Sequence, residues 1–417
     1  MTRFLIFLGL ILLAEYYSYV VVRSAMRTLP QNAKTIMTVV YILLTVITWA
    51  GFLSFKFIDW AKVPHLVRNI YIAFTMGFLL GKVVILIVML GDEVRRFFVW
   101  MWSVFSKPAI AATSIPEATG TGISRSIFLQ RTALLLGGTM LGGFMYGIRN
   151  RYNYRIRRVQ LSFKNLPAAF RGMKIVQISD VHSGSFDSHH AVQKGVEKIM
   201  EEKPDIIFFT GDLVNNKADE IQPYTDIFSK LSAPLGVYST LGNHDYGDYV
   251  QWPSAEEKKK NLDWLKETHG KMGWRLLMNE HVVLEKGEDK IAIVGIENWG
   301  AKAGFPKYGK MTDAFAGLRE KNVPFKMLLS HDPSHWDAEV RKDYTDIDLT
   351  FAGHTHGMQL GVEIPGLKWS PVQYVYKKWA GLYQEGEQYL YVNRGFGFLG
   401  YPGRLGILPE ITVVELV

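Results

Sequence analysis

Cysteine is absent from this chain of 417 residues. Its absence excludes disulfide bridges and every metal site that depends on thiolate ligands. It leaves the redox compartment open, because a protein without cysteine is stable on either side of a cell membrane. Internal repeats and low-complexity tracts are lacking as well.

Acidic side chains are scarce in the first part of the chain. Residues 1–172 hold 20 Lys+Arg and only 5 Asp+Glu, whereas residues 173–417 hold 27 and 34. The basic side chains of the first part flank long apolar segments, as in the loops of membrane proteins. This pattern argues against a nucleic-acid surface, so no nucleic-acid partner is expected.

Four apolar runs of 19–25 residues lie within the first 150 positions, at 4–22, 36–55, 66–90 and 127–148. A helix needs about 20 apolar residues to cross a bilayer. The runs therefore predict a membrane domain over residues 1–148 with about four transmembrane helices. Buried core helices are the alternative, but they would leave too little polar surface for a soluble domain. A fifth span over 94–110 is a further possibility.

Two charges and two glycines stand out within these runs. Glu15 and Lys82 would meet at similar depth in an up-down bundle. An ion pair that fixes helix register is favoured over a functional polar site. Gly138 and Gly142 form a small-xxx-small pattern that either lets another helix approach closely or marks loose packing. Residues 95–102 combine arginines with tryptophans, which is typical of the headgroup level.

Two further segments of the first part are expected to connect the helices and the two domains. Residues 107–126 are rich in small residues and proline, and we expect a loop. Residues 149–171 carry a cluster of arginines and are interpreted as a basic juxtamembrane linker.

From residue 172 the long apolar runs give way to short ones of about five or six residues. Runs rich in β-branched and aromatic residues, bounded by Gly, Pro and Asp, predict strands. They cover 174–179, 205–210, 237–241, 291–296, 325–330 and 347–352, with closing strands at 389–392 and 411–417. Helices are expected at 188–203 and 254–269. Alternating strands and helices predict an α/β domain with a largely parallel, buried sheet over 172–417.

Five short polar clusters follow these predicted strands directly. They are Asp180-Val181-His182, Gly211-Asp212, Gly242-Asn243-His244-Asp245, His331 and Gly353-His354-Thr355-His356. Because ligands bind at the carboxyl ends of strands in α/β sheets, we expect the clusters to converge along one edge. We interpret the six histidines outside them as surface or loop residues: His65, His189, His190, His269, His281 and His335.

The clusters suit two divalent cations. Imidazole, carboxylate and amide ligands without thiolate fit Mn, Zn, Fe or Ni. A carboxylate between the ions would offset their repulsion, and Asp212 is the natural bridge. Two such ions, about 3.5–4 Å apart, acidify a bridging water and clamp an in-line displacement at phosphorus. Each cluster is a weak signal alone, but together they predict hydrolysis of a phosphate ester by a metal-bridging hydroxide.

The order D-x-H, G-D, G-N-H-D, H, G-H-x-H resembles the calcineurin-like metallophosphoesterase superfamily over residues 172–417. The resemblance implies a four-layer αββα double β-sandwich. It also implies a role for each site residue. One metal would lie on Asp180, His182, Asp212 and His356, and the second on Asp212, Asn243, His331 and His354. His244 would protonate the leaving group or steady the transition state, oriented by Asp245.

A narrower likeness appears in three segments, 353–359, 393–397 and 408–417. They are similar to membrane-bound or exported bacterial phosphoesterases of the YkuE and YaeI type. Met358 replaces the glycine usual in such relatives, so the floor of the pocket is expected to differ. Arg394 and Arg404 are candidates for contact with a substrate phosphate, and a structural role is the alternative.

The leading expectation is therefore a membrane-anchored dimetal phosphoesterase acting on a lipid, lipid-linked or small phosphoester or pyrophosphate. Some similar enzymes act on a nucleotide-linked acyl-sugar pyrophosphate of lipid A synthesis, which makes it one implied substrate. A membrane sensor that binds a phosphorylated ligand without turnover is the alternative. We expect a multi-pass protein of the bacterial inner membrane. With four spans, the catalytic domain lies on the same side of the membrane as the N-terminus. Nine Lys and Arg residues near the spans lie on that side and seven on the other, which favours a cytoplasmic catalytic domain. Oligomeric state is not predicted.

Overall fold

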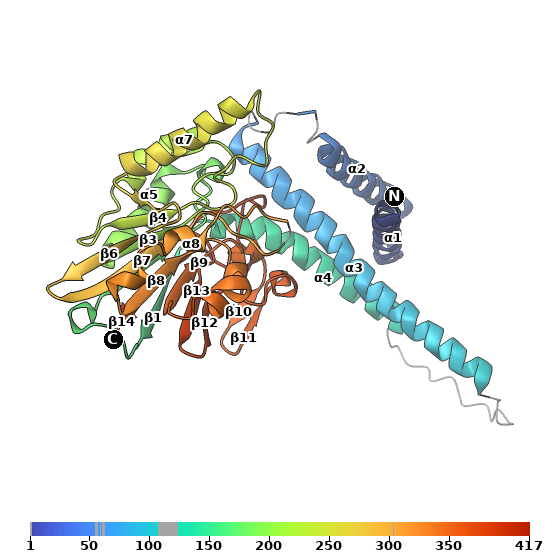
Figure 1. Cartoon of the computed structure of the whole chain (residues 1–417). Helices are drawn as coiled ribbons and strands as arrows, with labels where there is room; N and C mark the ends of the chain where they lie inside the picture. Colours follow the sequence, from blue (N-terminus) through green and yellow to red (C-terminus); the bar gives the residue numbers. More distant parts are fainter. Residues whose placement is uncertain (1, 55–56, 59, 61–62, 107–123, 303) are drawn as a thin grey trace. The chain divides into compact units, whose positions relative to one another are not determined.

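The computed structural model describes residues 2–54, 57–58, 60, 63–106, 124–302 and 304–417. The chain divides into two compact units, Met1–Tyr146 and Gly147–Val417. Most of the longer helices and strands of the two units are labelled in Figure 1.

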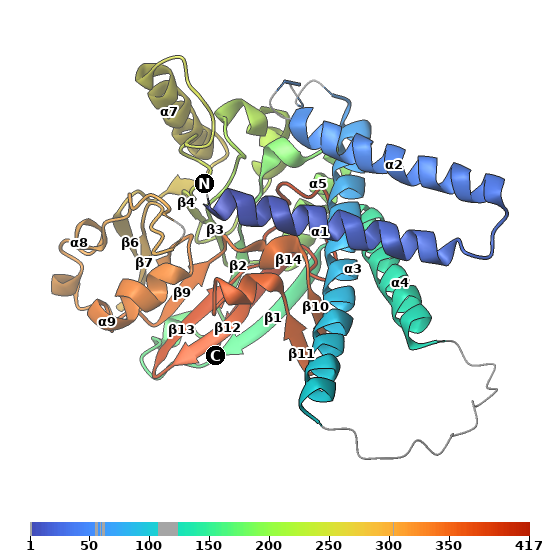
Figure 2. The same ribbon diagram turned by 90° about the vertical axis from the view of Figure 1, so that its right-hand side faces the viewer.

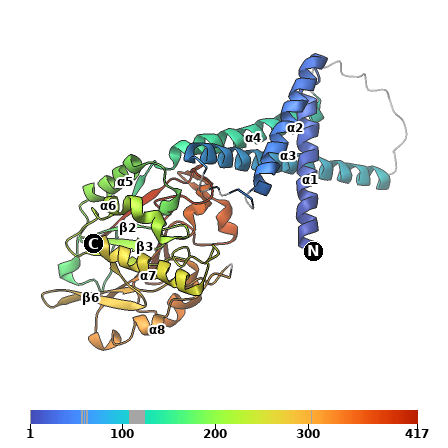
Figure 3. The ribbon, with the colours of Figure 1, turned by 90° about the horizontal axis from the view of Figure 1, so that it is seen from above.

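The first unit consists of long apolar helices, labelled in Figure 3. They are α1 (Thr2–Ala25), α2 (Gln31–Ser54), α3 (His65–Phe105) and α4 (Arg125–Gly147). Within the described residues, four helices are long and apolar enough to cross a membrane, as the four apolar runs predict.

Helix α3 is longer than the run that predicts it. It has 41 residues and continues through the segment expected at the headgroup level. At 1.5 Å per residue it is about 60 Å long, twice the roughly 30 Å of a hydrocarbon core. Residues 94–105 of the possible fifth span belong to this same helix. The expected loop at 107–126 falls almost entirely outside the described residues.

The predicted ion pair joins α1 and α3. Lys82 Nζ lies 2.7 Å from both carboxylate oxygens of Glu15 and 3.0 Å from Thr45 Oγ1. Trp49 Nε1 donates to Glu15 at 2.9 Å. Because Thr45 and Trp49 belong to α2, the pair holds three helices in register, and burial of Lys82 is compensated by its partners.

Close approach between helices occurs one position away from the predicted glycines. A Cβ placed on Gly138 or Gly142 would meet open space. A Cβ on Gly81 of α3 would instead lie 2.7 Å from the carbonyl oxygen of Gly137 in α4. The small residues that let these helices touch are therefore Gly81 and Gly137. Of the two alternatives for Gly138 and Gly142, close helix approach is contradicted and loose packing agrees with the open space beside them. Neighbouring residues of a helix point about 100° apart, so Gly137 can face α3 while Gly138 does not.

The second unit contains two six-stranded mixed sheets. The first has the order β1 (Arg155–Leu161), β14 (Glu410–Leu416), β2 (Lys174–Ile178), β3 (Ile206–Thr210), β4 (Val237–Thr240) and β5 (Arg275–Leu276). The second has the order β12 (Gly381–Glu385), β13 (Gln388–Val392), β9 (Leu349–Ala352), β8 (Phe325–Leu329), β7 (Asp289–Gly295) and β6 (Glu280–Lys286). Strands β10 (Val362–Ile364) and β11 (Leu367–Trp369) form a hairpin that is a separate two-stranded sheet.

Alternate residues of the strands build separate cores. Ile175 and Phe208 of the first sheet pack against Met327 and Phe351 of the second, which fills the space between the sheets. The outer face of the first sheet is covered by α5 (His189–Glu201) and α7 (Ala255–Lys271). The outer face of the second is covered by short helices that include α8 (Met311–Ala314) and η7 (Trp336–Val340). The four-layer αββα fold is confirmed.

The other helices of this unit are single turns or little more. They are η2 (Ile148–Asn150), η3 (Ala168–Phe170), η4 (Ser183–Ser185), η5 (Ala218–Tyr224), α6 (Thr225–Phe228), η6 (Arg319–Lys321), α9 (Arg341–Asp343), η8 (His356–Gln359) and η9 (Pro371–Tyr374).

The segment expected to be a basic linker, 149–171, belongs to the second unit. Its residues Arg155–Leu161 form β1 and pair in parallel with Glu410–Leu416. Arg157, within that strand, forms an ion pair with Glu363 at 2.8 Å. The strand was not predicted because β1 is an edge strand in which only Leu161 is fully buried, so its sequence lacks a clear apolar alternation.

Candidate metal centre

The predicted site residues gather at the carboxyl ends of five strands, β2, β3, β4, β8 and β9. Backbone hydrogen bonds tie the loops together beyond these strands. Asp180 N–H donates to the Gly211 carbonyl at 2.9 Å, and Gly353 N–H donates to the His331 carbonyl at 2.9 Å. The expected convergence along one edge is thus present in the fold.

The backbone turns sharply at most of these positions. Five of the seven predicted ligands have left-handed φ angles, namely Asp180 (53°), His182 (48°), Asp212 (60°), His354 (69°) and His356 (50°). Such a conformation costs a residue other than glycine of order 1–3 kcal/mol and persists only where the surroundings enforce it. Strained backbone is therefore concentrated at the predicted site.

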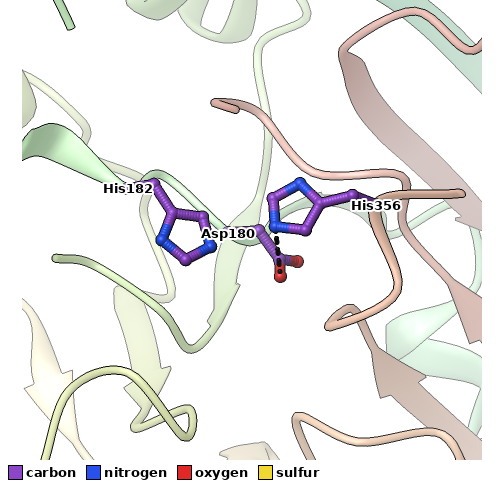
Figure 4. Close-up of side chains that lie close together, drawn as sticks. All are labelled: Asp180, His182 and His356. Atoms are coloured by element: carbon purple, nitrogen blue, oxygen red, sulfur yellow. Dashed lines mark ion pairs between the residues drawn. The ribbon is translucent and has the colours of Figure 1, made fainter. Parts of the chain in front are cut away.

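The first group consists of Asp180, His182 and His356, whose candidate ligand atoms lie within 4.8 Å of one another. Figure 4 shows these side chains together, with His356 Nε2 3.3 Å from Asp180 Oδ1. Both ring nitrogens of His182 and Nε2 of His356 are buried without a hydrogen-bond partner among the described residues. Burial lowers the pKa of His182 to about 3, so the ring is neutral, the form that binds a metal.

The second group consists of Asp212, His331 and His354, again within 4.8 Å. Asn243 completes it, because its Oδ1 lies 3.2 Å from His331 Nε2 and 2.8 Å from His354 Nδ1. The amide nitrogen of Asn243 donates to the Tyr249 hydroxyl at 2.9 Å, which leaves the oxygen for the site.

Asp212 lies between the two groups. Its Oδ2 is 3.5 Å from His182 Nε2 and 3.2 Å from His331 Nε2. Its Oδ1 accepts the backbone N–H of His244 at 2.8 Å. Burial opposes ionisation, but neighbouring His331 and His244 hold the pKa of Asp212 well below its usual range. The structure therefore brings all seven predicted ligands together around an ionised carboxylate, and the unpartnered ring nitrogens of His182 and His356 fit divalent cations.

The ligands are themselves held by outer hydrogen bonds. His331 Nδ1 donates to the Thr210 carbonyl at 2.7 Å, so Nε2 faces the site. His354 Nε2 lies 2.9 Å from the hydroxyl of Tyr376, which donates to Asp332 at 3.2 Å. Such partners orient metal-binding imidazoles. The sequence analysis missed both. Asp332 could have been noticed beside His331, but nothing in the sequence points to Tyr376.

Asp245 does not orient His244. Its carboxylate accepts the backbone N–H groups of Asp212 (2.9 Å), Leu213 (2.8 Å), Val214 (3.2 Å) and Gly242 (2.8 Å). His244 is oriented by the Asn215 carbonyl, 2.7 Å from its Nδ1. The expected His244–Asp245 pairing is therefore wrong. Asp245 points into the protein, where it fastens the loops after β3 and β4, and only His244 stays partly exposed.

Arg394 and Arg404 are both buried. Arg394 forms ion pairs with Glu410 and, at 2.6 Å, with Glu363. Arg404 donates to backbone carbonyls, including that of Arg394 at 2.7 Å, and approaches His356 Nδ1 at 3.4 Å. The terminal nitrogens of both guanidinium groups bind partners within the protein, and their Nε atoms are buried without a partner among the described residues. These contacts favour a structural role over contact with a substrate phosphate.

Two histidines interpreted as surface or loop residues are buried. His269 Nδ1 lies 2.9 Å from Ser239 Oγ, and His335 Nδ1 lies 2.9 Å from Ser330 Oγ. His335 Nε2 also lies 3.1 Å from Glu339, whereas His269 Nε2 is buried without a hydrogen-bond partner among the described residues. Neither histidine belongs to the two ligand groups, so the correction concerns their burial only.

Two family models match the chain. Residues 2–151 match "Probable Calcineurin-like phosphoesterase, transmembrane domain", and residues 173–358 match "Calcineurin-like phosphoesterase". The first match and the four candidate spans make this a membrane protein.

Individual relatives agree with these matches. The chain is 32% identical over 303 residues to the uncharacterised metallophosphoesterase YkuE of Bacillus subtilis (strain 168), covering 70% of this chain and 98% of the relative. It is 31% identical over 300 residues to phosphodiesterase YaeI of Escherichia coli (strain K12), covering 71% and 100%. It is 27% identical over 278 residues to UDP-2,3-diacylglucosamine pyrophosphatase LpxG of Chlamydia muridarum, covering 55% and 79%. This chain therefore belongs to the calcineurin-like metallophosphoesterases, and it is a metal-dependent phosphoric ester hydrolase with a transmembrane domain.

Proposed function

We propose that the protein hydrolyses a phosphate ester or pyrophosphate of a lipid or lipid-linked substrate, using two divalent ions drawn from Mn, Zn, Fe and Ni. The position of Asp212 carries the dimetal part of the proposal. One of its oxygens faces an imidazole of each ligand group, at 3.5 and 3.2 Å, as a carboxylate shared by two cations would. The ligand set proposed is Asp180, His182, Asp212 and His356 for one ion, and Asp212, Asn243, His331 and His354 for the other.

The lipid part is supported by two observations. Four helices long enough to cross a bilayer precede the catalytic unit in the chain, and such an anchor would keep the site near the membrane surface. Two relatives, at 27% and 29% identity, carry the name UDP-2,3-diacylglucosamine pyrophosphatase, whose substrate has a pyrophosphate and acyl chains. A nucleotide-linked acyl sugar is accordingly the first substrate to test.

When bound, a pair of divalent cations supplies polarisation of a phosphoryl oxygen and a nucleophile from water at neutral pH. His244 supplies the proton for the leaving oxygen. Its Nδ1 is held by the Asn215 carbonyl, which leaves Nε2 for the substrate. Asp245 keeps the Asp212 and Gly242 loops in place and is a positioning residue.

We also propose that the protein resides in the bacterial inner membrane with the catalytic unit in the cytoplasm. An even number of spans puts the N-terminus and the catalytic unit on one side. The basic residues near the spans favour the cytoplasm for that side.

Hydrolysis by the purified full-length protein tests the proposal. We expect turnover of bis-p-nitrophenyl phosphate and of UDP-2,3-diacylglucosamine in the presence of Mn, Zn, Fe or Ni, and loss of both with a chelator. Turnover of the first substrate alone would reject the nucleotide-linked acyl sugar. A comparison of lipids from cells with and without the protein would then identify the compound that accumulates. Absence of any lipid difference would contradict a lipid substrate.

A further inference from the structure

The β10–β11 hairpin has one apolar face and one polar face. Val362 pairs with Trp369 and Ile364 with Leu367, whereas Glu363 pairs with Lys368 between them. Directly opposite residues of an antiparallel pair project from the same side, and successive residues alternate sides. The four apolar residues therefore share one face of the hairpin.

The polar face is the one that binds the rest of the unit. Glu363 accepts from Arg157 of β1 at 2.8 Å and from Arg394 at 2.6 Å. Lys368 Nζ donates to the Ala380 carbonyl beside β12 at 2.6 Å. Figure 2 shows β10 and β11 next to β1, an edge strand of the first sheet, and the Lys368 bond links them to the start of β12, an edge strand of the second sheet. The hairpin is thus attached through its charges, and its apolar side faces outward.

Exposure of the apolar face is high and extends beyond the hairpin. Ile364 is 58% and Leu367 is 50% exposed, and Tyr374 just after the hairpin is 77% exposed. Val375 and Met358 are more than half exposed as well. Contiguous exposed apolar surface of this kind marks an interaction site. We call the set Met358, Val362, Ile364, Leu367, Trp369, Tyr374 and Val375 the apolar rim.

The apolar rim adjoins the candidate metal centre at both of its ends. Met358 follows the predicted ligand His356 by two residues, and Ser370 Oγ donates to the Gly357 carbonyl between them at 2.8 Å. Tyr376, directly after Val375, contacts His354 at 2.9 Å. Whatever covers the rim therefore lies beside the site.

The rim also lies close to the residue at which the chain enters the second unit. Gly147 ends α4, and its carbonyl accepts the backbone N–H of Arg404 at 3.0 Å. The next residue, Leu405, donates to Gln359 at 2.8 Å and accepts from Gly361 at 2.9 Å, immediately before β10. Three backbone hydrogen bonds thus connect Gly147, the first residue of the second unit, to the hairpin.

We propose that the apolar rim docks into the bilayer, with Ile364 and Leu367 among the acyl chains and Trp369 and Tyr374 at the headgroup level. Aromatic rings favour that level. Exposed Lys377 at the border suits anionic headgroups. The bilayer is the favoured occupant because the chain enters the second unit beside the hairpin, directly after the fourth candidate span. Docking would set the metal centre at the membrane surface, within reach of phosphates on lipid headgroups.

The absence of cysteine makes a direct test possible. Ile364→Cys and Leu367→Cys in the full-length chain are each labelled with the fluorophore NBD, in nanodiscs of phosphatidylethanolamine and phosphatidylglycerol. We expect a loss of NBD emission when the nanodiscs contain lipids with a nitroxide on the acyl chain. The matched control is Glu387→Cys in the exposed turn between β12 and β13, at the end of β12 away from the hairpin. The NBD emission of this control should not change.

Emission from the two hairpin positions that is as insensitive to the nitroxide lipids as the control would overturn the proposal. A blue-shifted emission that the lipids do not quench would overturn it too, because a protein partner would then cover the rim. Chelator-sensitive hydrolysis of bis-p-nitrophenyl phosphate shows whether each variant is folded. If Ile364→Cys or Leu367→Cys lacks this activity, the measurement is repeated with Val362→Cys and Tyr374→Cys. The assay reads contact with acyl chains and not turnover of a lipid, so it is decided separately from the proposed substrate.

Discussion

At the metal centre, Asp212 uses one carboxylate oxygen for the backbone N–H of His244 and leaves the other facing both ligand groups. Asp212→Ala should therefore lose metal, because neither group keeps its shared anion. We expect fewer than two ions per chain by elemental analysis of the purified protein. Asp263→Ala, on the exposed surface of α7, is the matched control and should keep its metal content. Two ions in the Asp212 variant would show that the bridge is misassigned.

His244 is partly exposed, and its ring centroid lies 5.0 Å from that of His182. His244→Ala should keep the bound metal but lose the proton donor, so kcat should fall by about 10²–10⁴. Steady-state hydrolysis of bis-p-nitrophenyl phosphate, with metal content measured in parallel, checks this. His190→Ala, at an exposed position of α5, should retain the full rate. An unchanged kcat in the His244 variant would remove its assigned role.

Asp245 has a different kind of effect, because it accepts four backbone N–H groups in a fully buried position. Asp245→Ala should destabilise the catalytic unit by about 3 kcal/mol or more, since each orphaned buried donor costs about 1–3 kcal/mol. The temperature of thermal unfolding in detergent measures this loss. A normal unfolding temperature with lost activity would instead point to a direct role in the reaction.

At the scale of elements, the Glu15–Lys82 pair connects α1, α2 and α3. Lys82→Met leaves Glu15 without its cation, and breaking a buried pair in this way costs about 3–5 kcal/mol. We expect a lower unfolding temperature of the full-length protein in detergent. The double variant Glu15→Gln/Lys82→Met should recover part of the loss, because no unpaired charge remains. Equal unfolding temperatures for the single variant and the unmodified protein would contradict a structural pair.

The elements predicted well are those whose signal is strong within a short window. Helices α1 and α2 and the buried strands β2 and β3 are mostly apolar over their whole length, and each forms the element that its sequence predicts. Strand β1 and the far half of α3 carry charges among apolar residues, so their sequence suggests a linker and an interfacial segment. Residues 155–161 form strand β1 because they pair with β14. The far half of α3 stays helical because no residue in it breaks the helix.

At the scale of the whole molecule, the predicted ligands come from five strand ends, so ions bound by both groups would link these ends and metal loss should loosen all of them. Two buried carboxylates, Asp180 and Asp212, then lie together without cations, which is unfavourable. We expect a chelator to lower the temperature at which tryptophan fluorescence reports unfolding, and added Mn or Zn to restore it. An unfolding temperature indifferent to the chelator would contradict metal binding by these groups.

The sequence by itself determined the four apolar helices, the α/β class and the seven candidate ligands, because each rests on residues close together in the chain. The ligand clusters follow strands directly, so the rule that strand ends share one edge was enough to bring them together. Only the tertiary structure decided the roles of Asp245, Arg394 and Arg404 and the outward apolar face of the β10–β11 hairpin. Their burial and partners depend on segments up to about two hundred residues away, as in the Arg157–Glu363 pair that fixes the hairpin.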